Sequence, residues 1–223
     1  MPFHKNGFTL ISNVFNNDSI SLVTNEVKDS DIGNCRGGIR NAEKKFRSIR
    51  LLLSSDKLTN IARDYLSGNP QLVRVIYFDK TPKNNWLVTW HQDKTVAVTK
   101  KFDREGWGPW STKDSIQHVQ PPLSVLNNMI TLRIHLDIAN KASGCLKVMP
   151  TSHKLGLLCQ EDIHKYCQKH IPVNCIANCG DVLVMRPHLL HSSSKAINPT
   201  SRRIIHIEYC GDTLPEGVQW AGS

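Results

Sequence analysis

The sequence predicts a mainly β protein with flanking helices. From Gln71 onward, short runs rich in Val, Ile, Tyr and Phe are separated by turn residues, which is typical of strands. The first 70 residues instead show helical periodicity. A chain of 223 residues can bury one core, so we expect a single domain over 1–223, with a helical preface at 1–70 and an antiparallel β body at 71–212.

Two segments indicate the helices of the preface. The stretch at 16–27 begins with Asn and Asp, which are favourable at helix N-termini. The stretch at 54–70 places its apolar residues on one stripe and ends at Gly68 and Pro70, which do not continue a helix well. That stripe consists of Leu58, Ile61, Ala62, Tyr65 and Leu66.

The strands of the β body are runs of apolar and β-branched residues bounded by Gly, Pro, Asn or Asp. They are expected at about 71–79, 87–98, 130–138, 145–149, 173–177, 181–186 and 202–210. A short amphipathic helix is expected between the strands ending at 149 and beginning at 173, with Ile163, Tyr166 and Cys167 facing inward.

A long connection at about 99–129 separates two of the expected strands. It is rich in Gly, Pro and Trp, and a connection of this length in a compact domain is usually a lid or a binding loop. Trp107 and Trp110 in this segment are candidates either for contact with a substrate or for anchoring the loop.

The composition excludes some classes of protein. Lys and Arg number 28 against 19 Asp and Glu, which gives a formal net charge of +9. The basic residues are scattered and no aromatic ladder accompanies them, so we expect no nucleic acid partner and favour a small, anionic ligand. The apolar runs are shorter than the roughly 20 residues of a membrane span, so no membrane association is expected.

The cysteine pattern indicates a reducing compartment. Seven cysteines are an odd number without C-x-x-C spacing, and the N-terminal residues lack a signal-peptide pattern. We therefore expect reduced thiols and a cytoplasmic protein. Cys175 and Cys179 are four residues apart and remain a less favoured zinc alternative.

The stretch "VTWHQDKTV" at 88–96 carries two polar residues on one face of an expected strand. His91 and Asp93 share that face, because side chains at i and i+2 project to the same side, whereas Gln92 points away. If this face is buried, both groups need a partner.

A third partner is available in "GDVLVMRPHLLHSSSKAINPTSRRIIHIEY" at 180–209. His191 follows an expected strand, with Ser193 two residues later and Arg202 at the start of the next strand. His188 competes with His191 but lacks the same spacing, and Arg203 competes with Arg202 but would face the opposite side of its strand.

Two histidines and one carboxylate form the facial triad that binds Fe(II) and leaves coordination positions open. His91, Asp93 and His191 are the candidate metal ligands and hence the candidate catalytic residues. Arg202 could bind a carboxylate through two hydrogen bonds, which suits the distal carboxylate of 2-oxoglutarate.

The chain resembles the phytanoyl-CoA dioxygenase family of Fe(II)/2-oxoglutarate oxygenases over about 35–220. One departure lies at 150–153, where "PTSH" stands in place of the family's common Pro-Gly-Ser-His. The matching stretches are "FDKTPKNNW" at 78–86, "WHQD" at 90–93, "LRIHLD" at 132–137, "GCLKVMPTSHKLG" at 144–156, "GDVLVMRPHLLHSSS" at 180–194 and "SRRIIHIEY" at 201–209.

The resemblance implies a double-stranded β-helix, the jelly-roll, cupin-like barrel. It implies iron at His91, Asp93 and His191, 2-oxoglutarate and dioxygen as cosubstrates, and release of succinate and carbon dioxide. Related halogenases replace the metal-binding carboxylate by a small residue, so Asp93 favours hydroxylation of an aliphatic C–H.

The resemblance also implies 2-oxoglutarate contacts from Arg202, Ser193 and Gln92. The contact from Gln92 conflicts with plain strand alternation unless a twist or bulge intervenes.

Arg133 shares a strand face with His135; it could meet a substrate anion or pair with Asp137 or another carboxylate. The identity of the substrate and the oligomeric state are not determined by these residues. The alternative to an oxygenase is a catalytically idle jelly-roll module that binds metal and 2-oxoglutarate.

Overall fold

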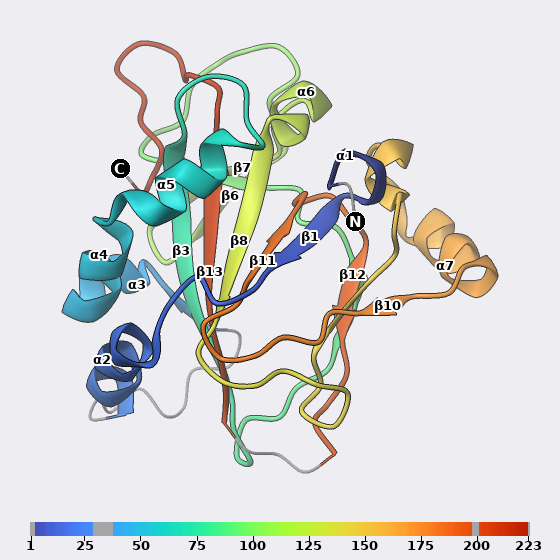
Figure 1. Cartoon of the computed structure of the whole chain (residues 1–223). Helices are drawn as coiled ribbons and strands as arrows, with labels where there is room; N and C mark the ends of the chain where they lie inside the picture. The colour runs from blue at the N-terminus through green and yellow to red at the C-terminus, as the bar shows by residue number, and fades with distance from the viewer. Residues whose placement is uncertain (1–2, 29–37, 198–200, 223) are drawn as a thin grey trace.

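The computed structural model describes residues 3–28, 38–197 and 201–222. Within these ranges the strands form three antiparallel sheets of six, four and three strands, and helices flank them (Figure 1). The predicted fold class, mainly β with flanking helices, is confirmed. Pairing among the described strands leaves the sheets open at their edges and does not close them into one continuous barrel.

The six-stranded sheet forms the centre of the molecule. Its strands follow the order β1-β11-β8-β13-β3-β2. The long neighbours β3 and β13 pair in register from Arg202 opposite Lys80 to Glu208 opposite Arg74. The bounds are β1 (Phe8–Ile11), β2 (Ile39–Arg40), β3 (Gln71–Lys80), β8 (Met129–His135), β11 (Val182–Met185) and β13 (Arg202–Cys210).

The two smaller sheets complete the β structure. The four-stranded sheet has the order β10-β9-β12-β4, and the three-stranded sheet has the order β5-β7-β6. The bounds of the first are β4 (Val88–His91), β9 (Leu146–Val148), β10 (Val173–Asn174) and β12 (His191–Ser193). Those of the second are β5 (Val96–Val98), β6 (Trp110–Lys113) and β7 (Ile116–Val119).

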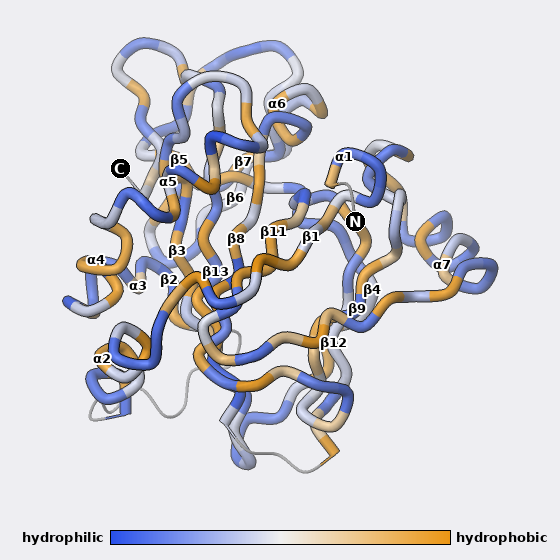
Figure 2. The backbone as a smooth tube through the Cα atoms, in the orientation of Figure 1, coloured by the Kyte–Doolittle hydropathy of each residue, from blue (hydrophilic) through white to orange (hydrophobic). Residues whose placement is uncertain are grey.

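Helices α2 to α5 lie along one side of the molecule, beside the six-stranded sheet (Figure 1). They bury Val23, Ile49 and Leu58 in the cluster that also contains the apolar residues of the sheet. Hydrophobic and hydrophilic residues alternate along these helices, as expected for helices packed on a sheet (Figure 2). The bounds are α1 (Phe3–Asn6), α2 (Asn17–Lys28), α3 (Ala42–Lys45), α4 (Arg47–Leu53), α5 (Asp56–Arg63), α6 (Leu123–Asn127), a 3-10 helix (Ser152–Leu155) and α7 (Gln160–Lys169).

The six-stranded sheet is apolar on the helix side and polar on its other face. Along β3, Val75 and Tyr77 pack in the helix-facing cluster, whereas Phe78 and Lys80 line an internal cavity. The same alternation holds in β8 and β13, as expected for successive side chains of a strand. The polar face consists of Arg74, Lys80, Arg133, Arg202, His206 and Glu208, and it lies inside the protein.

Four predicted segments differ from the structure. The helix expected at 54–70 is shorter, because α5 ends at Arg63. The strand expected at 87–98 is split into β4 and β5, because the Asp93 amide donates to the Pro187 carbonyl oxygen at 2.9 Å instead of continuing the sheet. The preface contributes both edge strands of the six-stranded sheet, β1 and β2, which are too short to display an alternating pattern. The segment at 99–129 contains the β6–β7 hairpin and α6, and β7 pairs with β5.

The described cysteines are free thiols, in agreement with the expectation of reduced cysteines, and Cys35 lies outside the described residues. Neither candidate metal group among the described residues contains a cysteine, so the zinc alternative at Cys175 and Cys179 gains no support. No helix within the described ranges combines the length and apolar character needed to cross a membrane.

Candidate metal centre

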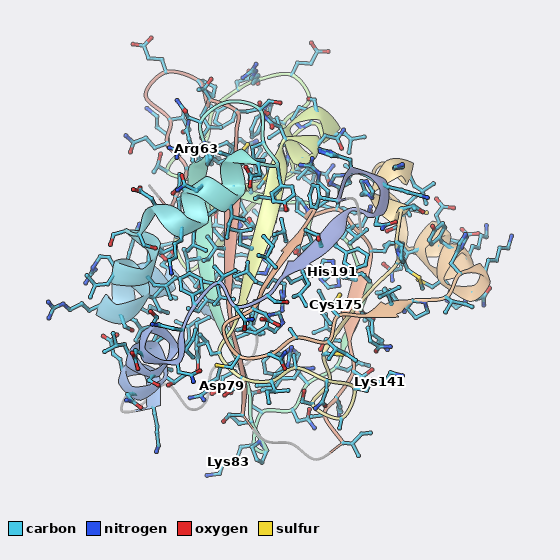
Figure 3. The ribbon with its side chains drawn as sticks, in the orientation of Figure 1. Arg63, Asp79, Lys83, Lys141, Cys175 and His191 are labelled. Atoms are coloured by element: carbon cyan, nitrogen blue, oxygen red, sulfur yellow. The ribbon has the colours of Figure 1, made fainter. Side chains whose placement is uncertain are left out.

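His91, Asp93 and His191 lie together between the two larger sheets. His91 ends β4 and His191 begins β12, where the two residues face each other in register. The Nε2 atoms of His91 and His191 are 3.7 and 3.4 Å from the carboxylate oxygens of Asp93. Figure 3 labels His191 on its strand. One ligand atom from each residue lies within 4.8 Å of the others, a spacing that a single metal ion can bridge.

Backbone carbonyl groups fix the orientation of both imidazole rings. Nδ1 of His91 is 2.8 Å from the Thr89 carbonyl oxygen, and Nδ1 of His191 is 2.8 Å from the Leu189 carbonyl oxygen. Each Nδ1 therefore carries the proton and donates it, which leaves the lone pair of Nε2 directed toward Asp93. This is the arrangement that orients metal-binding histidines in proteins.

The electrostatics favour the ligand forms of Asp93 and His91. Burial opposes ionisation of Asp93, but His191 and the other nearby histidines hold the pKa of Asp93 well below its usual value. Burial, together with the adjacent His191, lowers the pKa of His91. At neutral pH the centre therefore presents a carboxylate and a neutral imidazole, which are the forms that bind a metal.

A second group, Asp93, His206 and Glu208, also has metal-binding spacing. Its donors are already engaged, because Nδ1 of His206 accepts from Arg133 Nη1 at 2.9 Å and Nε2 of His206 contacts Glu208 Oε1 at 3.1 Å. The same Glu208 oxygen forms an ion pair with Arg74. We therefore prefer the group that contains His91 and His191, whose Nε2 atoms have no competing partner among the described residues.

The centre opens into a cavity of about 310 Å³. Residues of both larger sheets line it, including Phe78 and Arg133 from the six-stranded sheet and Val88 and Leu146 from the four-stranded sheet. This volume lies at the lower end of the range for small-molecule sites.

One end of the cavity holds two buried cations. Arg202 is buried, and its Nε atom has no hydrogen-bond partner among the described residues. Lys80, opposite Arg202 in the sheet, donates to Ser193 Oγ at 2.7 Å and to the Ser194 carbonyl oxygen at 2.6 Å. Ser193 Oγ also donates to the Gly144 carbonyl oxygen at 2.8 Å. Burial and the nearby charges of Arg202 and Arg133 lower the pKa of Lys80 to about 7.

The structure directs Gln92 away from the cavity, as plain strand alternation suggests. Its Nε2 donates to the carbonyl oxygens of Gly156 and His188 at 2.7 and 2.8 Å, and its Oε1 accepts from the Leu158 amide at 2.8 Å. Because backbone groups use the amide at both ends, the 2-oxoglutarate contact that the resemblance implies is not supported at this position.

Trp107 and Trp110 lie apart from the described lining of the cavity. Their rings pack against Phe102, with centroids 4.9 and 5.3 Å from it, in the cluster beside the three-stranded sheet. This packing favours the anchoring alternative, and contact with a substrate stays a prediction.

The remaining candidates, Arg203, Arg133 and His188, have different hydrogen-bond partners and surroundings. Arg203 faces the opposite side from Arg202, as predicted, and binds both carboxylate oxygens of Asp137. Arg133 therefore does not use Asp137, and its hydrogen-bond partner among the described residues is His206. His188 is buried outside the metal groups, near His153.

Sequence reasoning missed Lys80 and the ion pair between Arg74 and Glu208. A lysine at the end of an apolar strand normally indicates a solvent-exposed position. The available signal was alternation, because Arg74, Phe78 and Lys80 share one face of β3 and pair with a strand that carries His206 and Glu208 on the same face.

Comparisons with known proteins place this geometry in a family. The family model described as phytanoyl-CoA dioxygenase (PhyH) matches residues 3–204. A curated relative, phytanoyl-CoA dioxygenase 1 of Oryza sativa subsp. japonica, is 26% identical over 162 residues, which cover 68% of this chain and 48% of that protein. The chain thus spans about half the length of this curated relative.

Two solved structures share the fold. AviO1 from Streptomyces viridochromogenes Tue57 is 24% identical with a TM-score of 0.68, and the match covers 96% of this chain and 93% of that one. HygX from Streptomyces hygroscopicus, solved with nickel and 2-oxoglutarate bound, is 15% identical with a TM-score of 0.67, covering 96% and 86%. Since the family model spans most of the chain, including His91, Asp93 and His191, the chain belongs to the phytanoyl-CoA dioxygenase family.

Proposed function

We propose that the protein is an Fe(II)/2-oxoglutarate-dependent dioxygenase that hydroxylates an aliphatic C–H of a small organic substrate. The observation that carries the proposal is the pair of histidine Nε2 atoms directed at the Asp93 carboxylate beside a cavity with two buried cations. The structure of HygX with nickel and 2-oxoglutarate is consistent with it.

The donor set fits iron. Two neutral imidazoles and one carboxylate are the ligands that non-haem Fe(II) oxygenases use, and three protein ligands leave positions open. His91, Asp93 and His191 would hold the metal, with the carbonyl groups of Thr89 and Leu189 fixing the two rings.

The end of the cavity that holds Arg202 and Lys80 suits one carboxylate of a dicarboxylate. A buried guanidinium with an unpartnered Nε is costly unless an anion compensates it, and Arg202 is in this position among the described residues. Lys80 supplies a second positive charge directly across the sheet, and Ser193, whose hydroxyl proton is donated to the Gly144 carbonyl oxygen, holds Lys80 in place by accepting its hydrogen bond. We therefore assign the distal carboxylate of 2-oxoglutarate to Arg202, assisted by Lys80, with Ser193 positioning that lysine.

When bound, iron and 2-oxoglutarate would supply the activation of dioxygen, with release of succinate and carbon dioxide. The chain's own contribution is placement and the exclusion of water. Arg202 and Lys80 orient the cosubstrate and neutralise its charge, while Phe78, Val88 and Leu146 provide an apolar wall around the reacting carbon.

The test is succinate release from 2-oxoglutarate in air with added Fe(II) and a metabolite mixture, scored together with substrate mass gains of one oxygen. We expect release by the wild type and loss of at least about 100-fold in His91→Ala and Asp93→Ala. His164→Ala, an exposed histidine on α7, is the matched control and should retain full activity. Equal release by the wild type and the ligand variants would contradict the proposal.

The alternative, an idle module, would bind Fe(II) and 2-oxoglutarate anaerobically yet consume neither with any member of the mixture. We also propose that the protein is cytoplasmic and that residues 1–223 form a single dioxygenase domain.

A further inference from the structure

The cavity carries an excess of positive charge beyond what 2-oxoglutarate requires. Its described lining contains six cationic side chains and one carboxylate, that of Asp93. The cations are Arg40, Arg74, Lys80, Lys113, Arg133 and Arg202. Three of the six, Lys80, Arg133 and Arg202, are buried, and a buried cation is costly unless an anion compensates it.

Several of these charges are already compensated. Arg40 pairs with Asp114 at 3.0 Å near the surface, and Arg74 pairs with Glu208. Lys80 and Arg202 are assigned above to the distal carboxylate of 2-oxoglutarate. The cations left without a carboxylate among the described residues are Arg133, which is buried, and Lys113, which is exposed.

Arg133 is the informative one of the two. Only 7% of its surface is exposed, and its Nη1 donates to Nδ1 of His206 at 2.9 Å. His206 is neutral in this arrangement, since Nδ1 accepts from Arg133 and Nε2 donates to Glu208. Burial lowers the pKa of His206, which agrees with the neutral form. The carboxylate of Glu208 therefore pairs directly with Arg74, whereas Arg133 reaches it only through His206.

Arg133 lines the same cavity as Arg202 and lies opposite His206 in the sheet, four residues from Arg202 along β13. The two Cα atoms are about 13 Å apart, yet the pKa of Arg133 is lowered by burial and, next, by the charge of Arg202. With the distal carboxylate assigned to Arg202 and Lys80, Arg133 is a buried cation whose hydrogen-bond partner among the described residues is the neutral His206.

We infer that the substrate is a small organic anion whose carboxylate or phosphate group is bound by Arg133, an inference that rests on the proposed function. Arg133 and the metal-ligand candidate Asp93 line the same cavity of about 310 Å³, so oxygenation is expected at a carbon near the acidic group. Lys113, at the exposed part of the lining, adds a solvent-screened positive charge that should have little effect on affinity.

The rival role for Arg133 is a contact with the second carboxylate of 2-oxoglutarate. The experiment therefore measures both ligands. Protein loaded with Zn(II), which does not turn over, and 2-oxoglutarate is titrated calorimetrically with small carboxylic acids and phosphate monoesters, each paired with its neutral amide or alcohol. The same titrations are made with Arg133→Gln, Arg133→Lys and, as the matched control, Lys113→Gln.

We expect acids to bind more tightly than their neutral partners. The Kd of the best acid should rise at least about tenfold in Arg133→Gln, which removes a charged hydrogen bond, and less in Arg133→Lys. It should change by less than about twofold in Lys113→Gln, because an exposed charge is screened. The Kd of 2-oxoglutarate should stay within about twofold in all variants.

Neutral compounds binding as tightly as their acids, or a loss in Arg133→Gln that falls on 2-oxoglutarate and spares the acid, would overturn the inference. Failure of the wild type to bind metal and 2-oxoglutarate would instead contradict the proposed function. The two failures are thus distinguishable.

Discussion

At the scale of single residues, the site depends on which atoms are left free. His91 and His191 use Nδ1 on carbonyl groups two residues earlier in the chain and keep Nε2 for a metal, whereas both ring nitrogens of His206 are engaged. The neighbours Arg202 and Arg203 differ in the same way. Arg203 is saturated by Asp137, and Arg202 lies in the cavity with an unpartnered Nε.

The arginine pair yields the first prediction. Arg202→Lys keeps the charge but loses the planar fork, so the KM for 2-oxoglutarate should rise at least about tenfold with metal affinity unchanged. Arg203→Lys is the matched control; it should reduce stability through Asp137 without changing this KM. Steady-state succinate assays and metal titrations measure both. An equal KM effect in the two variants would remove Arg202 from its assigned role.

Lys80 yields the second prediction, on pH. With its pKa lowered to about 7, first by burial and then by the facing Arg202 and Arg133, Lys80 is charged below pH 7 and neutral above it. The other titratable group facing Lys80 is the Cys145 thiol, whose pKa is raised by burial, so that it stays neutral across this range. The affinity for 2-oxoglutarate should therefore fall as pH rises from about 6.5 to 8.5. Anaerobic titrations should show this slope in the wild type and a flatter one in Lys80→Met; parallel slopes would exclude Lys80 as the titrating group.

At the scale of elements, the long strands and the short strands supply different parts of the site. The long strands β3, β8 and β13 supply Lys80, Arg133 and Arg202 on one face. The metal ligands come from the ends of the short strands β4 and β12 and from the residues just after β4. Gln92, between the two ligands of that segment, ties it to the backbone at 156–158 and at 188.

The third prediction concerns these hydrogen bonds of the Gln92 side chain. Gln92→Leu leaves buried backbone groups without partners, so the free energy of unfolding should fall by about 1–3 kcal/mol. The KM for 2-oxoglutarate should stay within about twofold, because the side chain points away from the cavity. Urea denaturation and kinetics on the same preparation distinguish the outcomes. A large rise in KM with unchanged stability would instead support the cosubstrate contact that the family resemblance implies.

At the scale of the whole molecule, the sequence predicted the class of fold and the triad but not the polar interior. The strand at 202–210 is recognisable by its composition, and the helix within 54–70 by its periodicity, although α5 ends at Arg63, before the predicted stop. His91, Asp93 and His191 are recognisable by residue type and spacing. The edge strands β1 and β2 are too short for a pattern. Lys80 and Glu208 were missed because a polar strand face normally indicates solvent, and only the pairing of the two larger sheets around a cavity places it inside.

The buried histidines yield a prediction for the whole fold. Burial lowers the pKa of His118, His135 and His188 to about 4. The folded protein therefore binds fewer protons than the unfolded chain between pH 4 and 6.5, and stability is lost as pH falls through this window. Each histidine contributes at most about 1.4 kcal/mol per pH unit. Urea denaturation at pH 7.5 and 5 should show the loss, and His118→Phe should reduce it; equal stability at the two pH values would contradict the prediction.

We expect one metal ion and 2-oxoglutarate to occupy the cavity between the larger sheets. A structure of crystals grown anaerobically with Fe(II) and 2-oxoglutarate, with anomalous data at the iron edge, would locate both. It should show one anomalous peak bonded to Nε2 of His91, Nε2 of His191 and the Asp93 carboxylate, with the distal carboxylate of 2-oxoglutarate on Arg202. A peak at Asp93, His206 and Glu208, or no iron in the cavity, would contradict this expectation.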